Sequence, residues 1–363
     1  MSAGECSTAA AADQPTAREQ VAALRSRGRR RLRLVVAGLA VLVLALMAVR
    51  VLLGAYTVTI PDFFRILGGE QIPGATYIVM QSKLPRAVGA ALAGAAFGAS
   101  GSLFRRTLRN PLASPDLIGI SAGASAGAVV AMTVLGWRGP GMAIGALIGG
   151  LGVAGIVLAF ARSGGARGSG GATTAMGSEK VIVAGIALSS LAMVIVSQIV
   201  LSLEKGDLQS VSVWTSGSLS TANWTRITWL AIALVILLPL GLAIHQALAP
   251  ADLGADFAHG LGARPERTGF LALVVGALLA SAATAAFGPL AFVALLSTPL
   301  ARGLTGGRPS LPVAALVGAA IVVAADFLGT EAIPGVRLPT GILTGAAGAP
   351  LMLWLLIRSK SKV

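Results

Sequence analysis

The segment from Lys83 to Gly127 constrains the fold of this chain more than any other. An apolar run rich in Gly and Ala breaks at the basic turn 104–110, and a second apolar run restarts at 111–116. Small residues let apolar helices approach closely in lipid, whereas glycine destabilises helices in water. The segment therefore predicts two tightly packed membrane spans joined by a charged loop.

Composition extends this interpretation to the whole chain of 363 residues. Hydrophobic residues make up 55% and charged residues only 12%, and the mean hydropathy is +0.83. A soluble globule would have too little charged surface at this composition. Glycines recur at four-residue spacing within the apolar runs, which predicts close helix crossings, with a pathway or gating role as the alternative for some of them. These glycines are Gly94 and Gly98, Gly119, Gly123 and Gly127, Gly145 and Gly149, and Gly341 and Gly345.

Apolar runs of about 20 residues, the length that crosses a bilayer, predict an all-α integral membrane protein with ten transmembrane helices. An even number places both termini on one side, and a cytoplasmic position puts most of the 28 Lys and Arg residues on the inner side, as expected from the positive-inside rule. Around Gly288-Pro289 a broken helix and a tight turn are both open. The spans are expected at 33–53, 85–104, 116–136, 140–161, 181–203, 226–248, 268–286, 289–304, 311–329 and 340–357.

The N-terminal region is expected to be a disordered basic cytoplasmic tail over residues 1–32, followed by a polytopic transmembrane domain over 33–358. Six arginines between Arg25 and Arg33 precede an apolar run of span length. A signal peptide has a shorter apolar core of about 7 to 15 residues and a small-residue cleavage site. We therefore expect a retained first helix.

Chemistry-bearing residues are scarce. The formal net charge is +14, but the cations sit at the ends of apolar runs, which indicates topology and not nucleic-acid binding. Cys6 is the single cysteine, and His245 and His259 are the only histidines, so no metal site is expected. The Gly-rich stretch 164–171 lacks the Lys-Ser/Thr ending of a phosphate-binding loop. We expect no catalytic site, no bound cofactor and no enzymatic activity in this chain.

Asp326 is the exception to the scarcity of charge inside the predicted spans. A carboxylate in the membrane is a functional-site hypothesis by default, yet its place near the outer end of its helix favours capping or ion pairing. Ion-coupled carriers usually need carboxylates or unwound helices at mid-membrane depth. The energy for any transport is therefore expected from outside the chain.

The cytoplasmic segment 249–267 differs from the other loops. Residues Leu253 to Gly262 place apolar side chains at helical spacing between two Leu-Gly pairs, which predicts a short surface helix between glycine stops. Such a helix could dock into a groove of a partner protein, or lie on the lipid headgroups.

Several sequence motifs follow one another in a specific order and at specific separations. They are Lys83-Leu84-Pro85-Arg86, Leu92-Ala93-Gly94-Ala95-Ala96 with Ser100-Gly101, Arg109-Asn110-Pro111-Leu112-Ala113-Ser114-Pro115-Asp116 with Leu117-Ile118-Gly119, Ala184-Gly185-Ile186-Ala187-Leu188, Trp214 with Gly217-Ser218-Leu219 and Trp224, the two Leu-Gly pairs, Gly288-Pro289 with Phe292-Val293, and Leu338-Pro339-Thr340-Gly341. Together they resemble the motifs of the FecCD/BtuC-type permease family of bacterial ATP-binding cassette (ABC) importers for iron–siderophore complexes, haem and cobalamin. The resemblance covers the chain from about residue 55 to the C-terminus.

The resemblance implies a type II importer permease fold in the cytoplasmic membrane. It implies a dimer with a second permease subunit, identical or paralogous, together with two cytoplasmic ATPases that bind ATP and magnesium and an extracytoplasmic substrate-binding protein. The segment 249–267 then corresponds to the coupling helix that docks into the ATPase. The residues assigned in this way are Leu253, Gly254, Ala258, Leu261 and Gly262 for ATPase coupling, Lys83, Arg86 and Arg337 for binding-protein docking, and Ser100, Gly101, Asn110, Pro111, Gly288 and Pro289 for the pathway or its gating.

The chain departs from the family pattern at Arg105, where Gln is common, and at Thr298-Pro299, where Pro-His is usual. The family also commonly has an Arg shortly after the intramembrane Asp, whereas the residues up to Thr330 include none here. Arg337 is assigned to docking as a substitute for that arginine. The motifs around Ser114–Gly119 and Trp214–Leu219 favour a ferric siderophore as substrate. Haem and cobalamin are the alternatives within the family, and an ion-coupled secondary transporter or a membrane scaffold are those outside it.

Overall fold

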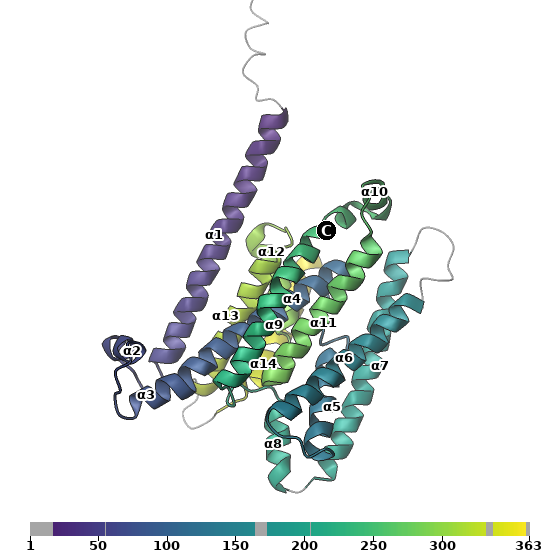
Figure 1. Ribbon diagram of the computed structural model, residues 1–363. Coiled ribbons are helices and arrows are strands. Elements are labelled where there is room, and N and C mark those ends of the chain that lie inside the picture. Colours follow the sequence, from purple (N-terminus) through teal and green to yellow (C-terminus); the bar gives the residue numbers. More distant parts are fainter. Residues whose placement is uncertain (1–16, 55, 164–172, 204, 332–336, 361–363) are drawn as a thin grey trace, which may run out of the picture.

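The computed structural model describes residues 17–54, 56–163, 173–203, 205–331 and 337–360. Within these ranges the regular secondary structure is all helical (Figure 1). Seven helices are long and apolar enough to cross a membrane, and shorter apolar helices accompany them. The helices are α1 Ala17–Leu52, α2 Ile60–Leu67, α3 Ala75–Tyr77, α4 Leu84–Leu108, α5 Ile120–Thr133, α6 Pro140–Ser163, α7 Thr173–Leu201, α8 Lys205–Thr215, α9 Trp224–Ala247, α10 Ala255–Gly260, α11 Pro265–Phe287, α12 Val293–Thr305, α13 Leu311–Glu331 and α14 Thr340–Lys360, with a π-helical turn Ile78–Lys83 before α4 and a 3₁₀ turn Pro250–Leu253 before α10.

Each of the ten predicted spans coincides with one helix, namely α1, α4, α5, α6, α7, α9, α11, α12, α13 and α14. Successive members run in opposite directions, so α1 begins and α14 ends toward the end of the bundle that carries α10 (Figure 1). We refer to this end as the cytoplasmic end and to the end near α2 and α8 as the outer end. The arrangement agrees with the even number of spans that the charge distribution predicts.

Two of the predicted spans begin later than expected, because irregular backbone precedes them. Residues 116–119 form turns, so α5 begins at Ile120, and residues 288–292 interrupt the path between α11 and α12. At 1.5 Å per residue the 13 residues of α12 cover about 20 Å, less than the hydrocarbon thickness of about 30 Å. Leu290 in the interruption is fully buried, which satisfies the rule that irregular backbone at membrane depth is enclosed by protein.

The expected disordered tail is wrong for residues 17–32. These residues continue α1 as one helix to Leu52, because a span already formed supplies the costly helix nucleus and extension then adds one hydrogen bond per residue. Residues 1–16, with Cys6, and the Gly-rich stretch 164–171 lie outside the described residues.

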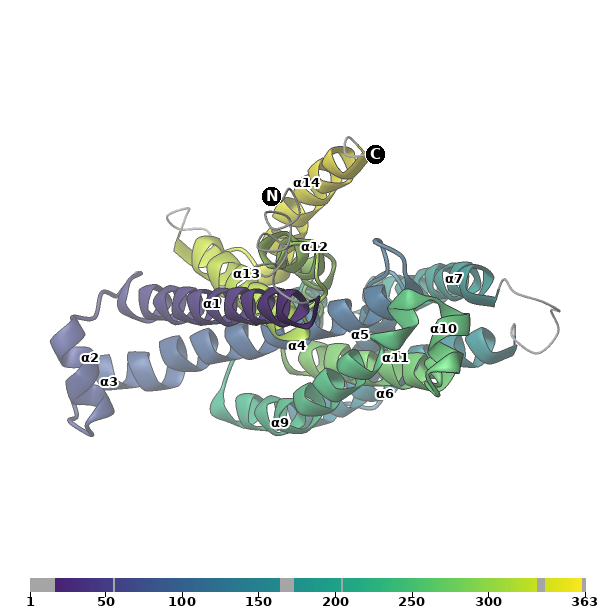
Figure 2. The same ribbon diagram turned by 90° about the horizontal axis from the view of Figure 1, so that it is seen from above.

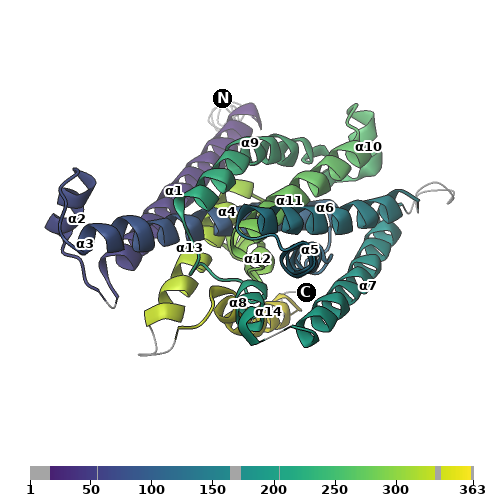
Figure 3. The same cartoon turned by 60° about the horizontal axis from the view of Figure 1, so that its bottom comes forward.

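Helix α4 occupies the centre of the bundle and packs against α13, α11, α12 and α9 (Figures 2 and 3). The predicted pair Gly94 and Gly98 makes the contact with α13. A methyl group added at Gly94 would lie 2.3 Å from the carbonyl oxygen of Gly318, and one at Gly98 would lie 2.2 Å from that of Ala314. Gly123 and Gly127 of α5 face Gly149 and Gly145 of α6 in the same manner. Packing is therefore the observed role of these glycines.

We expect Gly98→Val to destabilise the protein by at least about 1–3 kcal/mol, because its side chain would meet the backbone of α13, which cannot rotate away. Gly152→Val on α6 is the matched control, since a methyl group there would meet no atom within 4 Å. Thermal unfolding of the two variants in detergent measures the difference. Equal melting temperatures would contradict the backbone contact.

Candidate functional site

The segment between α9 and α11 forms a knob at the cytoplasmic end of the bundle (Figure 1). Leu253, Phe257 and Leu261 are 67%, 72% and 68% exposed. They lie in the 3₁₀ turn, in α10 and directly after α10, respectively. Gly254 and Gly262 bracket α10 with φ of +113° and +74°, a backbone region that favours glycine. The predicted short helix between glycine stops is confirmed in shape. Phe257, which the sequence assignment omitted, is the most exposed of these three apolar side chains.

Two arginines at the cytoplasmic end of α4 hold this segment. Arg106 forms a salt bridge with Asp252 at 2.6 Å and also donates to the carbonyl oxygen of His245. Arg109 donates to the carbonyl oxygen of Ala251. On the other side, His259 lies 3.2 Å from Glu266 at the start of α11. Ala258 is fully buried, so it anchors α10 and presents no surface to a partner.

A buried ionic cluster lies at the outer end of the bundle around Asp326. The carboxylate of Asp326 accepts hydrogen bonds from Arg50 at 2.8 Å, from Arg86 at 2.8–2.9 Å and from Thr340 at 2.9 Å. These four residues come from α1, α4, α13 and α14. The predicted ion pairing of Asp326 is confirmed, and its carboxylate ties four helices together.

This cluster changes the interpretation of the predicted docking cations. Lys83 is buried, and its ammonium donates to the carbonyl oxygens of Val51, Leu53 and Tyr56 at the end of α1. The Arg86 side chain is 15% exposed and is bound to Asp326. Both therefore present little free charge outward, whereas Arg337 is exposed. Docking by these three residues stays a prediction.

Motif residues that are far apart in sequence meet where α8, α11 and α14 end or begin. Gly288 and Gly217 have φ of +79° and +71°, and a methyl group on either would strike the backbone of the other turn, at Trp214 or Pro289. The amide of Gly341 donates to the carbonyl oxygen of Gly217 at 2.9 Å. Of the predicted pathway or gating residues, Gly288 and Pro289 therefore belong to a backbone junction.

This junction borders a cavity of about 450 Å³ between α5, α7 and α14. The cavity lining is mostly apolar, with several hydroxyl groups and the carboxylate of Asp116. Ser121 donates to one oxygen of Asp116, while the other is buried and has no hydrogen-bond partner among the described residues. A buried carboxylate oxygen needs a donor, and the cavity is the place from which one can approach. The polar lining residues are Ser114, Asp116, Ser121, Ser125, Ser189, Thr215 and Ser216.

The other predicted pathway residues lie elsewhere. Ser100 is buried and donates to the carbonyl oxygen of Gly276 at 2.7 Å, and Gly101 packs on Ala294 of α12. Asn110 accepts the amide of Leu112 in the turn after α4, followed by the exposed Pro111. None of these four residues lines the Asp116 cavity. Their sequence positions gave no sign of which helix face borders an opening, and a gating role for them stays a prediction.

The departure at Arg105 has a clear place in the fold. Arg105 is buried, and its guanidinium donates to the carbonyl oxygen of Leu295 at 2.5 Å, which links α4 to α12. Among the described residues, no group of three or more His, Cys, Asp or Glu side chains is placed to hold a metal ion.

A profile of the FecCD transport family matches residues 23–358 of the chain. The chain belongs to the FecCD transport family. It is thus a transport subunit and a multi-pass protein of the cytoplasmic membrane. The predicted family is confirmed, together with the all-α membrane fold.

The similarity to other members of the FecCD family extends over almost the whole length of those proteins. The chain is 30% identical to a ferric enterobactin transport system permease protein of Escherichia coli (strain K12). The alignment spans 310 residues and covers 85% of this chain and 91% of the relative. The chain is 33% identical over 324 residues to an Fe(3+)-citrate import system permease protein of Bacillus subtilis (strain 168), covering 88% and 93%. The fold is similar to that of a metal-chelate type ABC transporter in an inward-facing conformation, with a TM-score of 0.76 at 24% identity over 89% of this chain and 98% of that one.

We expect Asp326→Ala to destabilise this FecCD-family protein by about 3–5 kcal/mol, because Arg50 and Arg86 would remain as buried, uncompensated charges. The matched control is Asp62→Ala, which removes an exposed carboxylate. Yield and thermal unfolding in detergent measure the effect. A melting temperature unchanged by Asp326→Ala would show that the cluster does not support the fold.

Solvent access tests the cavity. In a Cys6→Ser background the chain has no cysteine, so a single new thiol can be followed. We expect Ser216→Cys, on the cavity wall, to react with a water-soluble thiol reagent, and Ser100→Cys, in the α4–α11 contact, to stay protected. Labelling rates in membrane vesicles give the comparison. Faster labelling at position 100 would move the pathway to α4.

Proposed function

We propose that this chain is the permease subunit of an ABC importer that moves a ferric siderophore across the cytoplasmic membrane by alternating access. The observation that carries the coupling is the exposure of three apolar side chains, Leu253, Phe257 and Leu261, on a segment that Arg106 of α4 binds through Asp252. The substrate class rests on relatives whose names specify ferric enterobactin and ferric citrate.

The proposed energy source is a partner ATPase, and the engagement of Asp326 agrees with it. Asp326 is fully engaged by two arginines and a threonine, so it is poorly suited to take up and release a coupling ion. A partner that binds ATP and magnesium supplies the energy in this proposal, and the chain itself has no ATPase activity and no cofactor. An apolar triad with aromatic character is the kind of surface that anchors in a pocket of a partner.

The assembly contains a second permease subunit, identical or paralogous, two ATPases at the α10 end and a binding protein at the outer end. The Asp116 cavity borders the pathway. Arg337 is the exposed member of the predicted docking set and is the cation through which an acidic binding protein would orient.

Iron uptake in cells that lack this chain tests the proposal. Cells complemented with wild type are expected to take up radiolabelled iron as a ferric siderophore. In cells complemented with Phe257→Asp we expect an uptake rate roughly thirtyfold lower, which corresponds to the loss of one hot-spot residue at an interface. Phe257→Leu is the matched control that keeps the apolar contact. Because Phe257 is exposed, both variants should reach the membrane at wild-type levels, which immunoblotting checks.

Three results would redirect the assignment. Normal iron uptake in the deletion strain, with loss of haem or cobalamin uptake, would replace the substrate. Uptake that persists without any ATPase would favour an ion-coupled transporter. Full activity of Phe257→Asp would show that these side chains do not form the coupling surface.

A further inference from the structure

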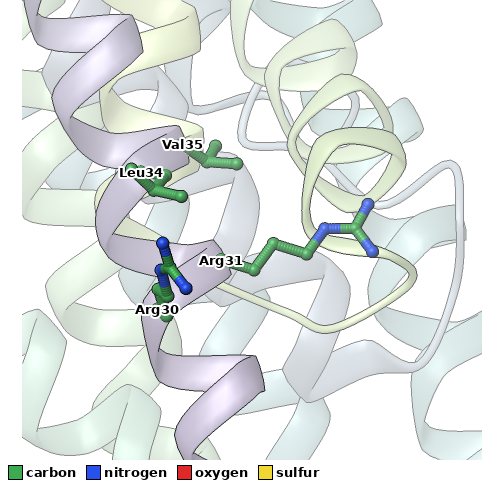
Figure 4. A pocket seen from close by; sticks show the side chains of 4 residues that line it. All are labelled: Arg30, Arg31, Leu34 and Val35. Atoms are coloured by element: carbon green, nitrogen blue, oxygen red, sulfur yellow. The ribbon is translucent and has the colours of Figure 1, made fainter.

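A basic pocket lies at the cytoplasmic end of the bundle, on the side of α1. Arg30, Arg31, Leu34 and Val35 line a cavity of about 420 Å³, and Arg31 reaches from α1 toward the turn between α12 and α13 (Figure 4). The guanidinium of Arg31 donates to the carbonyl oxygen of Leu304 at 3.1 Å. Four of its five N–H donors are thus left for another acceptor.

A third arginine contacts α1 about one helical turn before the pocket. A methyl group at Gly28 would lie 2.0 Å from a guanidinium nitrogen of Arg308, so this side chain packs directly on α1. No Asp or Glu occurs in residues 21–61, which contain the apolar run of α1. None occurs in residues 295–325, which contain the turn between α12 and α13. Within the described residues, no salt bridge includes Arg30, Arg31 or Arg308. Clustered cations without a counter-charge attract an anion.

The other wall of the pocket is apolar and continues into the lipid-facing surface. Leu34 is 63% exposed, and Val41 and Leu44 farther along α1 are each 65% exposed. Arg33 is the last charged residue before the apolar stretch of α1, so the pocket lies at the depth where headgroups meet acyl chains.

We propose that this pocket binds the headgroup of an anionic phospholipid of the cytoplasmic leaflet. The phosphate lies on Arg30 and Arg31, whose planar guanidinium groups bind phosphate oxygens in pairs, and an acyl chain follows Leu34 along α1. Basic pockets between transmembrane helices on the cytoplasmic side suit such lipids. The lipid thereby joins α1 to the α12–α13 turn. A free phosphate would satisfy the arginines but would leave the apolar wall unused.

Two double variants with the same loss of charge test the site. Successive residues of an α-helix are rotated by about 100°, so Arg29 and Arg33 lie on the opposite side of α1 from the pocket. Arg30→Gln with Arg31→Gln should weaken binding of phosphatidylglycerol on the order of thirtyfold, because each basic residue near a membrane surface contributes roughly fivefold. Arg29→Gln with Arg33→Gln should bind as wild type does. Native mass spectrometry of the full chain, titrated in detergent, measures binding, with phosphatidylcholine of the same acyl chains as the neutral lipid.

A third variant separates a lipid from a free anion. Leu34→Gln should weaken binding of phosphatidylglycerol, and inorganic phosphate at millimolar concentration should not displace the lipid. The proposal is overturned if both double variants lose affinity equally, if phosphatidylcholine binds as well as phosphatidylglycerol, or if inorganic phosphate competes. The lipid proposal is also overturned if the Arg30→Gln, Arg31→Gln double variant retains the lipid but a copurified ATPase displaces it. The pocket would then be assigned to the ATPase.

Discussion

Backbone contact between α4 and its neighbours is the constraint on which the rest of the structure depends. In lipid no hydrophobic driving force brings helices together, so their association relies on van der Waals contact at short range. Gly94 and Gly98 bring α4 onto α13, and Gly101 brings it onto Ala294 of α12, where a methyl group would lie 2.1 Å from the carbonyl oxygen. Because α4 is held along its length, the positions of both its ends are fixed.

The two ends of α4 carry the two ionic anchors of the molecule. At the outer end, Arg86 binds Asp326 and Lys83 binds the last carbonyl groups of α1. At the cytoplasmic end, Arg106 and Arg109 hold the segment that presents Phe257. One continuous helical stretch, Ala75–Leu108, joins them. The 3₁₀ turn before α10 therefore connects α10 to α4, and α4 connects it to the helices that meet at Asp326. The geometry supplies this connection, and measured coupling between the two ends would establish its use.

Hydropathy predicted the ten helices because each apolar run carries its own signal, and glycine spacing predicted the close crossings for the same local reason. The partner of Arg86 could not be predicted, since Asp326 is 240 residues away and a terminal arginine is usually a membrane anchor. Phe257 was missed because family motifs directed attention to the flanking glycines. The Asp116 cavity requires knowledge of which faces of α5, α7 and α14 meet, and their apolar sequences have no amphipathic pattern that would show it.

The arginines at the cytoplasmic end have more than one physical role, although the positive-inside rule gives each of them the same weight. Arg106 binds a carboxylate and Arg109 a carbonyl oxygen of the same chain, so both are structural. Arg105 is buried against α12. Arg30, Arg31 and Arg308 lie along the same part of α1 without an acidic residue in 21–61 or 295–325, so their charge remains available to a ligand. The distinction depends on the nearby carboxylates and carbonyls and not on the number of cations. Insertion signals and binding sites can therefore be separated only once the helices are placed.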